Sequence, residues 1–149
     1  MTDLSDDLTL AAVTADLLRQ GRSLHVASVV LTVAAGVGVP LLAVLQPRVW
    51  PMAGASLALL FGLAEAWFAL RVGFDRQIFE RFAGHATPPL APSQFDRVLV
   101  ALGLATAETP GRTMADRVRG CARLLRLQVL AFVLQIAALL LGGWLAVLV

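Results

Sequence analysis

Apolar residues are concentrated in three long runs along the chain. Leu24–Leu45 and Leu127–Val149 contain no formal charge, and Met52–Leu70 is interrupted by a single acid, Glu65. A helix needs roughly 20 apolar residues to cross the hydrocarbon core of a bilayer, and each run has about that length. Backbone polar groups in lipid must be paired within the segment that crosses it. The pattern therefore predicts three transmembrane helices.

The composition supports a membrane location. The 149 residues are 58% hydrophobic and 15% charged, with a mean hydropathy of +0.80, whereas a soluble domain carries about 25% charged residues. A small soluble globule leaves too much of its chain at the surface to hide this much apolar material. We predict an all-α integral membrane protein with three transmembrane helices and a small helical cytoplasmic element between helices 2 and 3.

The chain divides into four predicted segments. Residues 1–22 form a cytoplasmic amphipathic helix, 23–72 a hairpin of the first two transmembrane helices, 73–123 a cytoplasmic helical segment, and 124–149 the third transmembrane helix. The first helix, over residues 5–20, is expected to end at Gly21 and to dock on protein or lie on the membrane. Its apolar face is Leu8, Ala11, Ala12, Ala15 and Leu18.

The second and third transmembrane helices are expected to extend beyond the membrane and to pack against each other there. An apolar stripe of Phe74, Ile78 and Phe82 follows the second run, at helical spacing. It is expected to meet Leu125, Val118 and Met114, with a short helix over residues 94–103 at the tip. Two i,i+4 ion pairs, Arg71–Asp75 and Arg76–Glu80, are predicted to support the second extension.

Arginine predicts the orientation. All 12 basic residues are Arg, and 11 of them lie before the first run, after the second, or before the third. Only Arg48 lies between the first and second runs. The excess of basic residues in cytoplasmic loops then places the N-terminus in the cytoplasm and the C-terminus in the periplasm. The preference for Arg over Lys, with abundant Ala, Leu, Val and Gly, suggests a GC-rich bacterial genome and hence the inner membrane.

Glu65 is the most informative single residue because it lies within an apolar run. Small residues spaced along its helix allow neighbouring helices to approach closely; the predicted helix-packing positions are Gly54, Ala58, Gly62 and Ala69. Counting inward from the cytoplasmic ends places polar residues of the other two helices near its depth. The predicted intramembrane polar cluster is Glu65, Ser28, Thr32, Gln128 and Gln135.

Two roles for Glu65 are open at this stage. Loss of water disfavours the charged form of a carboxylic acid, so we expect Glu65 to be protonated or to be hydrogen-bonded within the cluster. The acid then stabilises helix packing, within the chain or toward a partner subunit. Alternatively, it handles protons or ions, which is the default hypothesis for an ionisable residue inside a membrane.

A second cluster is the basic face of Arg119, Arg123 and Arg126, just before the third run. Juxtamembrane arginines attract anionic lipid head groups by about 1 kcal/mol per charge. The alternative is that they determine topology and pair with Asp75 and Glu80. Nucleic acid is not expected as a partner because a wider basic surface with stacking aromatic residues is missing.

No catalytic motif is present in the sequence, and we expect neither an enzyme nor a cofactor. His25 and His85 have no Cys, Asp or Glu at metal-ligand spacing, so they predict no metal site. The expected function is a non-enzymatic accessory or scaffold subunit of a larger bacterial inner-membrane complex, in contact with lipids and with other subunits or further copies of itself. The alternative is a homo-oligomeric channel or proton-coupled transport component that uses Glu65.

Overall fold

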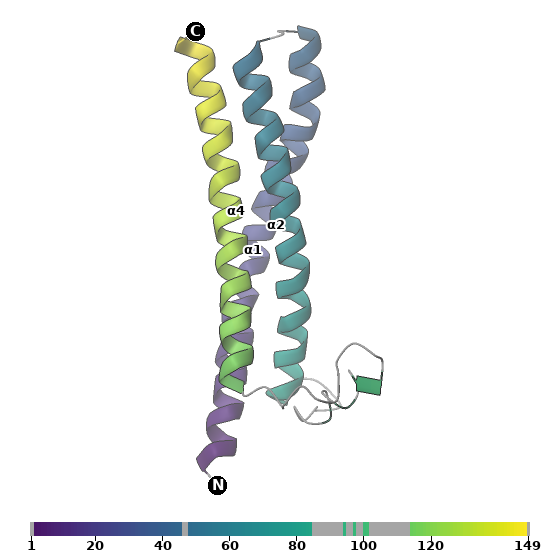
Figure 1. The fold of residues 1–149 in the computed structure, drawn as a ribbon, viewed down its shortest axis with the longest axis vertical. Coiled ribbons are helices and arrows are strands. Elements are labelled where there is room, and N and C mark those ends of the chain that lie inside the picture. Colours follow the sequence, from purple (N-terminus) through teal and green to yellow (C-terminus); the bar gives the residue numbers. More distant parts are fainter. Residues whose placement is uncertain are drawn as a thin grey trace.

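The protein is a bundle of three long helices. The computed structural model describes residues 2–45, 48–84, 94, 97, 100–101 and 114–148. The helices are α1 (Thr2–Leu45), α2 (Val49–Phe82) and α4 (Met114–Leu148), and no strand occurs in these ranges (Figure 1). Each helix contains a stretch long and apolar enough to cross a membrane. The prediction of an all-helical chain with three potential spans is confirmed.

The helix α1 is continuous from Thr2 to Leu45, so the predicted helix end at Gly21 is wrong. A glycine inside a helix costs only about 1 kcal/mol relative to alanine. The packing of α1 residues before and after Gly21 on the other helices outweighs that cost. A Cβ atom at Gly21 would lie 3.0 Å from Gln128 Oε1 and 3.2 Å from Leu125 Cδ1 of α4. Gly21 therefore marks a close approach of two helices rather than a turn.

The helices are longer than a membrane is thick. At about 1.5 Å per residue, the 44 residues of α1 extend roughly 66 Å, whereas the hydrocarbon core spans about 30 Å. The helical residues outside the three apolar runs lie mostly at the end of the bundle that carries most of the arginines. We call this part the stalk and define it as residues 7–22 of α1, 71–82 of α2 and 114–126 of α4.

The stalk has its own apolar core, to which all three helices contribute. It consists of Ala11, Ala15 and Leu18 of α1, Val72, Phe79 and Phe82 of α2, and Cys121 of α4. Ala11, Ala15 and Leu18 of the predicted apolar face thus pack on the other helices of the chain, whereas Leu8 of that face is exposed. Val118 and Leu125 pack at the edge of this core, as does Ile78. An ion pair of 3.5 Å between Arg19 and Glu80 also joins α1 to α2.

One predicted contact in the stalk is wrong. The side chain of Phe74 is 61% exposed, and Phe79 is buried at 2%. The inward face of α2 is therefore Val72, Phe79 and Phe82 with Ile78 at its edge, so Ile78 and Phe82 of the predicted stripe pack inward and Phe74 does not. Both α1 and α4 pack on α2 in the stalk. The side of α2 that faces both helices is therefore rotated from the side that would face α4 alone.

Beyond Gly84, the segment between α2 and α4 is described at four positions only. Gln94, Arg97, Val100 and Ala101 are in helical conformation. The remaining residues of the predicted helix 94–103 lie outside the described residues, as does the side chain of Met114. The cytoplasmic element between helices 2 and 3 therefore stays a prediction.

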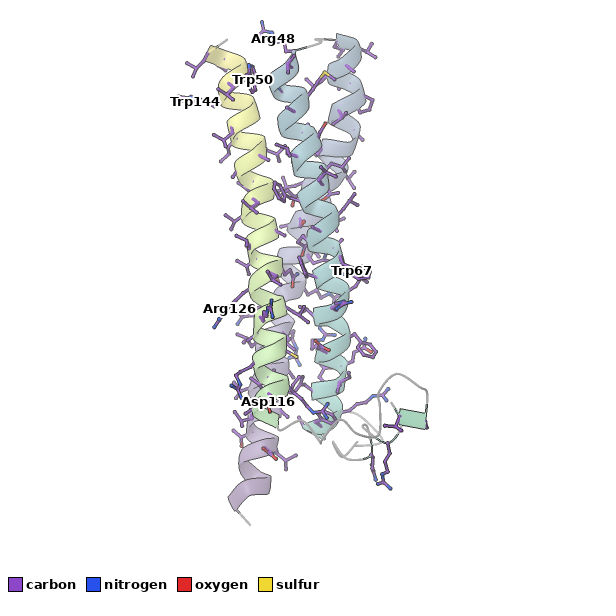
Figure 2. All side chains as sticks on the ribbon, viewed as in Figure 1. Arg48, Trp50, Trp67, Asp116, Arg126 and Trp144 are labelled. Atoms are coloured by element: carbon purple, nitrogen blue, oxygen red, sulfur yellow. The ribbon has the colours of Figure 1, made fainter. Side chains whose placement is uncertain are left out.

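The tryptophans lie at two levels of the bundle (Figure 2). Trp50 and Trp144 lie together at the end opposite the stalk, and Trp67 lies near the level of Arg126. Seventeen helical residues separate Trp50 from Trp67, which corresponds to roughly 25 Å along the axis. This spacing resembles the two aromatic belts of a protein that crosses a bilayer.

Candidate intramembrane polar site

The five residues of the predicted polar cluster meet in the interior of the bundle. Glu65, Ser28, Gln128 and Gln135 are each 0% exposed, and Thr32 is half-buried. They come from all three helices, and their hydrogen bonds form two groups at different depths. Buried polar atoms must be hydrogen-bonded to avoid the full cost of desolvation. Most of the polar atoms of this cluster are hydrogen-bonded within the chain.

The deeper group joins α1 to α4. Ser28 Oγ donates a hydrogen bond to Gln135 Oε1 at 2.7 Å. The amide of Gln135 donates to Thr32 Oγ1 at 2.9 Å and to the Ser28 carbonyl at 3.3 Å. Thr32 in turn donates to the Ser28 carbonyl at 2.7 Å. Every polar atom of the Gln135 side chain is thus used in contacts with α1.

The group nearer the stalk joins all three helices. Gln128 Nε2 of α4 donates to Glu65 Oε1 of α2 at 2.7 Å and to the Gly21 carbonyl of α1 at 3.0 Å. The other atom of this amide, Gln128 Oε1, is buried and has no hydrogen-bond partner among the described residues. An unpaired buried acceptor of this kind is uncommon and calls for an explanation.

The structure adds to the cluster a residue outside the predicted set, His25. His25 Nδ1 lies 3.0 Å from Glu65 Oε2, and the histidine side chain is 35% exposed while that of Glu65 is 0% exposed. Either an Nδ1–H group donates to the carboxylate, or a protonated carboxyl group donates to Nδ1. The spacing of Gly21, His25, Ser28 and Thr32 places all four on one face of α1, and this regularity was the available signal.

Glycines allow the helices to approach closely around the cluster. A Cβ atom at Gly54 would lie 2.7 Å from the Cα atom of Gly142, so the backbones of α2 and α4 are in direct contact there. A Cβ atom at Gly62 would overlap Thr32 Oγ1 and would lie 2.7 Å from Gln135 Nε2. Ala58, which lies between these two glycines in α2, is fully buried. Ala69, closer to the stalk, is half-buried.

The predicted basic face lies on the exposed side of α4. Arg119 pairs with Asp116 of its own helix at 2.6 Å, and Arg123 and Arg126 are exposed. The predicted pairing of this face with Asp75 and Glu80 is wrong for the described residues. Glu80 pairs instead with Arg19 and Arg76.

Asp75 and Cys121 form a contact in the stalk, beyond the predicted spans. Cys121 Sγ lies 3.4 Å from Asp75 Oδ2 and donates to it. Burial raises the pKa of Asp75, and burial together with the adjacent carboxylate raises the pKa of Cys121 to about 12. The thiol is therefore protonated at neutral pH and is a weak nucleophile. The predicted Arg71–Asp75 ion pair is absent, since Arg71 lies over the Trp67 ring at 5.0 Å.

The cluster is thus an amide, hydroxyl and carboxyl network with one imidazole at its edge. Within the described ranges, no group of three or more His, Cys, Asp or Glu side chains could hold a metal ion. The arrangement can hold three helices together, and it contains one acid–imidazole pair able to exchange a proton. No known protein family, curated protein or solved structure matches this chain.

Proposed function

We propose that this chain is a non-enzymatic accessory or scaffold subunit of a larger complex in the bacterial inner membrane, with its stalk in the cytoplasm. One observation carries the proposal: an apolar stripe on the outer surface of the stalk. Leu10, Val13 and Leu17 of α1 are 43%, 63% and 44% exposed. Their spacing of three and four residues places them along one side of the helix.

The position of this stripe favours a protein partner over lipid. An amphipathic helix that binds a membrane surface lies in the plane of that surface. Here the stripe belongs to a helix that continues without a break into an apolar span, so the stripe projects away from the bilayer. Contiguous exposed apolar surface in an aqueous region marks an interaction site. A helix of a partner subunit is the occupant that suits a stripe of this shape.

The internal polar network supports the same proposal. The buried polar side chains hydrogen-bond mainly within the chain, so the three-helix unit satisfies most of these groups without a partner subunit. A self-sufficient unit with one apolar stripe outside the membrane is suited to act as an anchored docking element. The polar cluster then stabilises the anchor, and the stalk presents the binding surface.

Substitution of the stripe tests the proposal. In native membranes extracted with mild detergent, we expect the wild-type chain to co-purify with a partner. Leu17→Glu and Val13→Glu should each weaken this association roughly tenfold or more, as is typical for the central residue of an interface. Association is measured by mass and by identification of the co-purified chains.

Leu8→Glu is the matched control, because Leu8 is 46% exposed and lies on the opposite side of the same helix. This variant should retain the partner. A lone wild-type monomer would contradict the proposal, and so would equal loss of the partner in Leu8→Glu and Leu17→Glu. If only copies of this chain co-purify, the protein is a homo-oligomer and not a subunit of a larger complex.

A second candidate function, proton handling as part of a channel or transport component, is favoured by the contact between His25 and Glu65. A single buried acid makes a poor relay, but an acid 3.0 Å from an imidazole can exchange a proton with it. The acid is fully buried and the imidazole is partly exposed, which is the arrangement that transfer between solvent and an intramembrane site requires.

Flux through vesicles tests this candidate. The purified chain is reconstituted into vesicles containing a pH-sensitive dye, and a pH gradient is imposed. If the pair conducts, the wild type dissipates the gradient and Glu65→Gln does not, although the variant remains folded. Equal rates in wild type, Glu65→Gln and protein-free vesicles would exclude conduction by this chain alone.

A further inference from the structure

A pocket lies beside the polar cluster on its stalk side, between α1, α2 and α4. Its volume is about 180 Å³, and its lining includes Gly21, Arg22, His25, Gly73, Arg76 and Gln128. Arg22 is exposed, as is the neighbouring lining residue Gln77, so the pocket opens at the surface of the stalk. Gln128 is fully buried, so the inner part of the pocket reaches the hydrogen-bonded network around Glu65.

We propose that this pocket is a hydrated vestibule that delivers protons from the aqueous side of the stalk to the His25–Glu65 pair. The inference rests on the second candidate function and specifies its route of access. Glu65 is not itself part of the pocket lining, and the route therefore passes through the imidazole of His25.

The unpaired atom of Gln128 is the first argument for hydration. Gln128 Oε1 is a buried acceptor without a partner among the described residues, and it lies beside Gly21, another residue of the lining. A buried acceptor requires a donor, and water is the donor that such a pocket can supply. Each water occupies about 30 Å³ and needs two to four polar partners. The pocket has room for several, and its lining supplies polar groups from all three helices.

The groups around the pocket direct the proton toward the carboxyl group. Arg22 of α1 and Arg76 of α2 line it together with His25, whereas α4 contributes Gln128 and no charged side chain among the described lining residues. A guanidinium group has only N–H donors and accepts no proton, so the imidazole is the group of this lining that can take one up. Among the described residues, the acid in contact with the ring is Glu65, at 3.0 Å, and a proton that leaves Nδ1 passes to it.

The transfer is balanced as a relay through neutral imidazole. A hydronium ion in the vestibule gives a proton to His25 Nε2 and becomes water, and the proton on Nδ1 moves to Oε2 of the Glu65 carboxylate. The products are a neutral carboxylic acid and the Nε2–H tautomer of neutral imidazole. The reverse sequence releases the proton to the same side. One proton enters for each Glu65 neutralised, and no other reactant is needed.

Two glycines provide a plug and its matched control. Gly73 lines this pocket and Gly120 lines a different pocket of the stalk. A Cβ atom at either position would meet no heavy atom within 4 Å, so both sites tolerate a larger side chain. Gly73→Leu should obstruct the vestibule, and Gly120→Leu should leave it open.

The readout is exchange of the His25 ring protons with water. The chain contains two histidines, so labelling with ¹⁵N-histidine and comparison with His85→Gln assigns the His25 signals in the full chain embedded in lipid. We expect the His25 signals to respond to aqueous pH and to exchange with water in the wild type and in Gly120→Leu. In Gly73→Leu the exchange should be slower by several-fold or more.

Two results would overturn the vestibule: no exchange of His25 with water in the wild type, or equal exchange rates in the two leucine variants. The outcome is separable from that of the conduction assay. If Gly73→Leu slows exchange while wild-type vesicles hold a pH gradient as well as Glu65→Gln vesicles do, the pocket serves as a proton-binding site without conduction. If conduction occurs and Gly73→Leu changes nothing, protons reach Glu65 by another route.

Discussion

Gly62→Val should cause a large loss of stability. A Cβ atom at this position would overlap Thr32 Oγ1 and would lie 2.7 Å from Gln135 Nε2. The added side chain must therefore separate α2 from α1 and α4 at the point where Ser28, Thr32 and Gln135 are hydrogen-bonded. Overpacking costs about 1–3 kcal/mol, and each lost interhelical hydrogen bond adds about 0.6–2 kcal/mol. We expect a total loss of at least about 3 kcal/mol.

Gly143→Val is the control for this prediction. It makes the same substitution in a helix of the same bundle, where a Cβ atom would meet nothing within 4 Å. Unfolding in detergent or bicelles, followed by circular dichroism, should show a large decrease for Gly62→Val and a change within about 1 kcal/mol for Gly143→Val. Similar stability of the two variants would mean that α1 does not pack on Gly62 as described.

The architecture of three helices long and apolar enough to cross a membrane could be predicted because long apolar runs have few alternative explanations. A run such as Leu127–Val149 must be buried in lipid or in a core that a chain of 149 residues cannot build. The helix-packing glycines could be predicted for a similar reason. Gly54 and Gly62 lie on one face of α2, and a face of small residues serves close contact.

Features that depend on how two helices cross could not be predicted in the same way. His25 and Glu65 are 40 residues apart, and depth counts along ideal vertical helices place His25 at the membrane boundary and Glu65 well inside it. In the bundle α1 crosses behind α2 (Figure 1). The side chains of His25 and Glu65 therefore meet although the depths counted for the two residues differ. The exposure of Phe74 has the same origin, because the inward direction of α2 depends on where both neighbours lie.

The continuity of α1 shows where local and tertiary effects compete. Gly21 is a valid helix-end signal in isolation. Here its missing side chain makes room for Gln128, and its carbonyl accepts a hydrogen bond from the same residue. Glycine is therefore required by the packing of α4, which no property of residues 1–45 alone reveals.

Glu65→Leu and Glu65→Gln should differ strongly in stability. Glutamine retains an oxygen that can accept from Gln128 Nε2 and an amide that can donate to His25 Nδ1, so it can make both side-chain hydrogen bonds of the acid. Leucine removes both. It leaves one N–H of Gln128 unpaired in the bundle interior, and the cost of an unsatisfied buried group is about 1–3 kcal/mol. We expect Glu65→Gln to unfold within about 1 kcal/mol of the wild type and Glu65→Leu to be less stable by about 1–3 kcal/mol.

The comparison is sharpest when Gln128→Leu is combined with Glu65→Leu. Gln128 donates to Glu65 at 2.7 Å, so removal of both partners eliminates the unpaired amide that Glu65→Leu creates. The double variant should recover part of the stability lost by the single one, because paired polar groups replaced by apolar groups of similar shape leave nothing unsatisfied. Unfolding measurements on the four proteins give the coupling energy. Strictly additive losses would show that the two side chains do not interact, and the polar cluster would then not be the element that holds the three helices together.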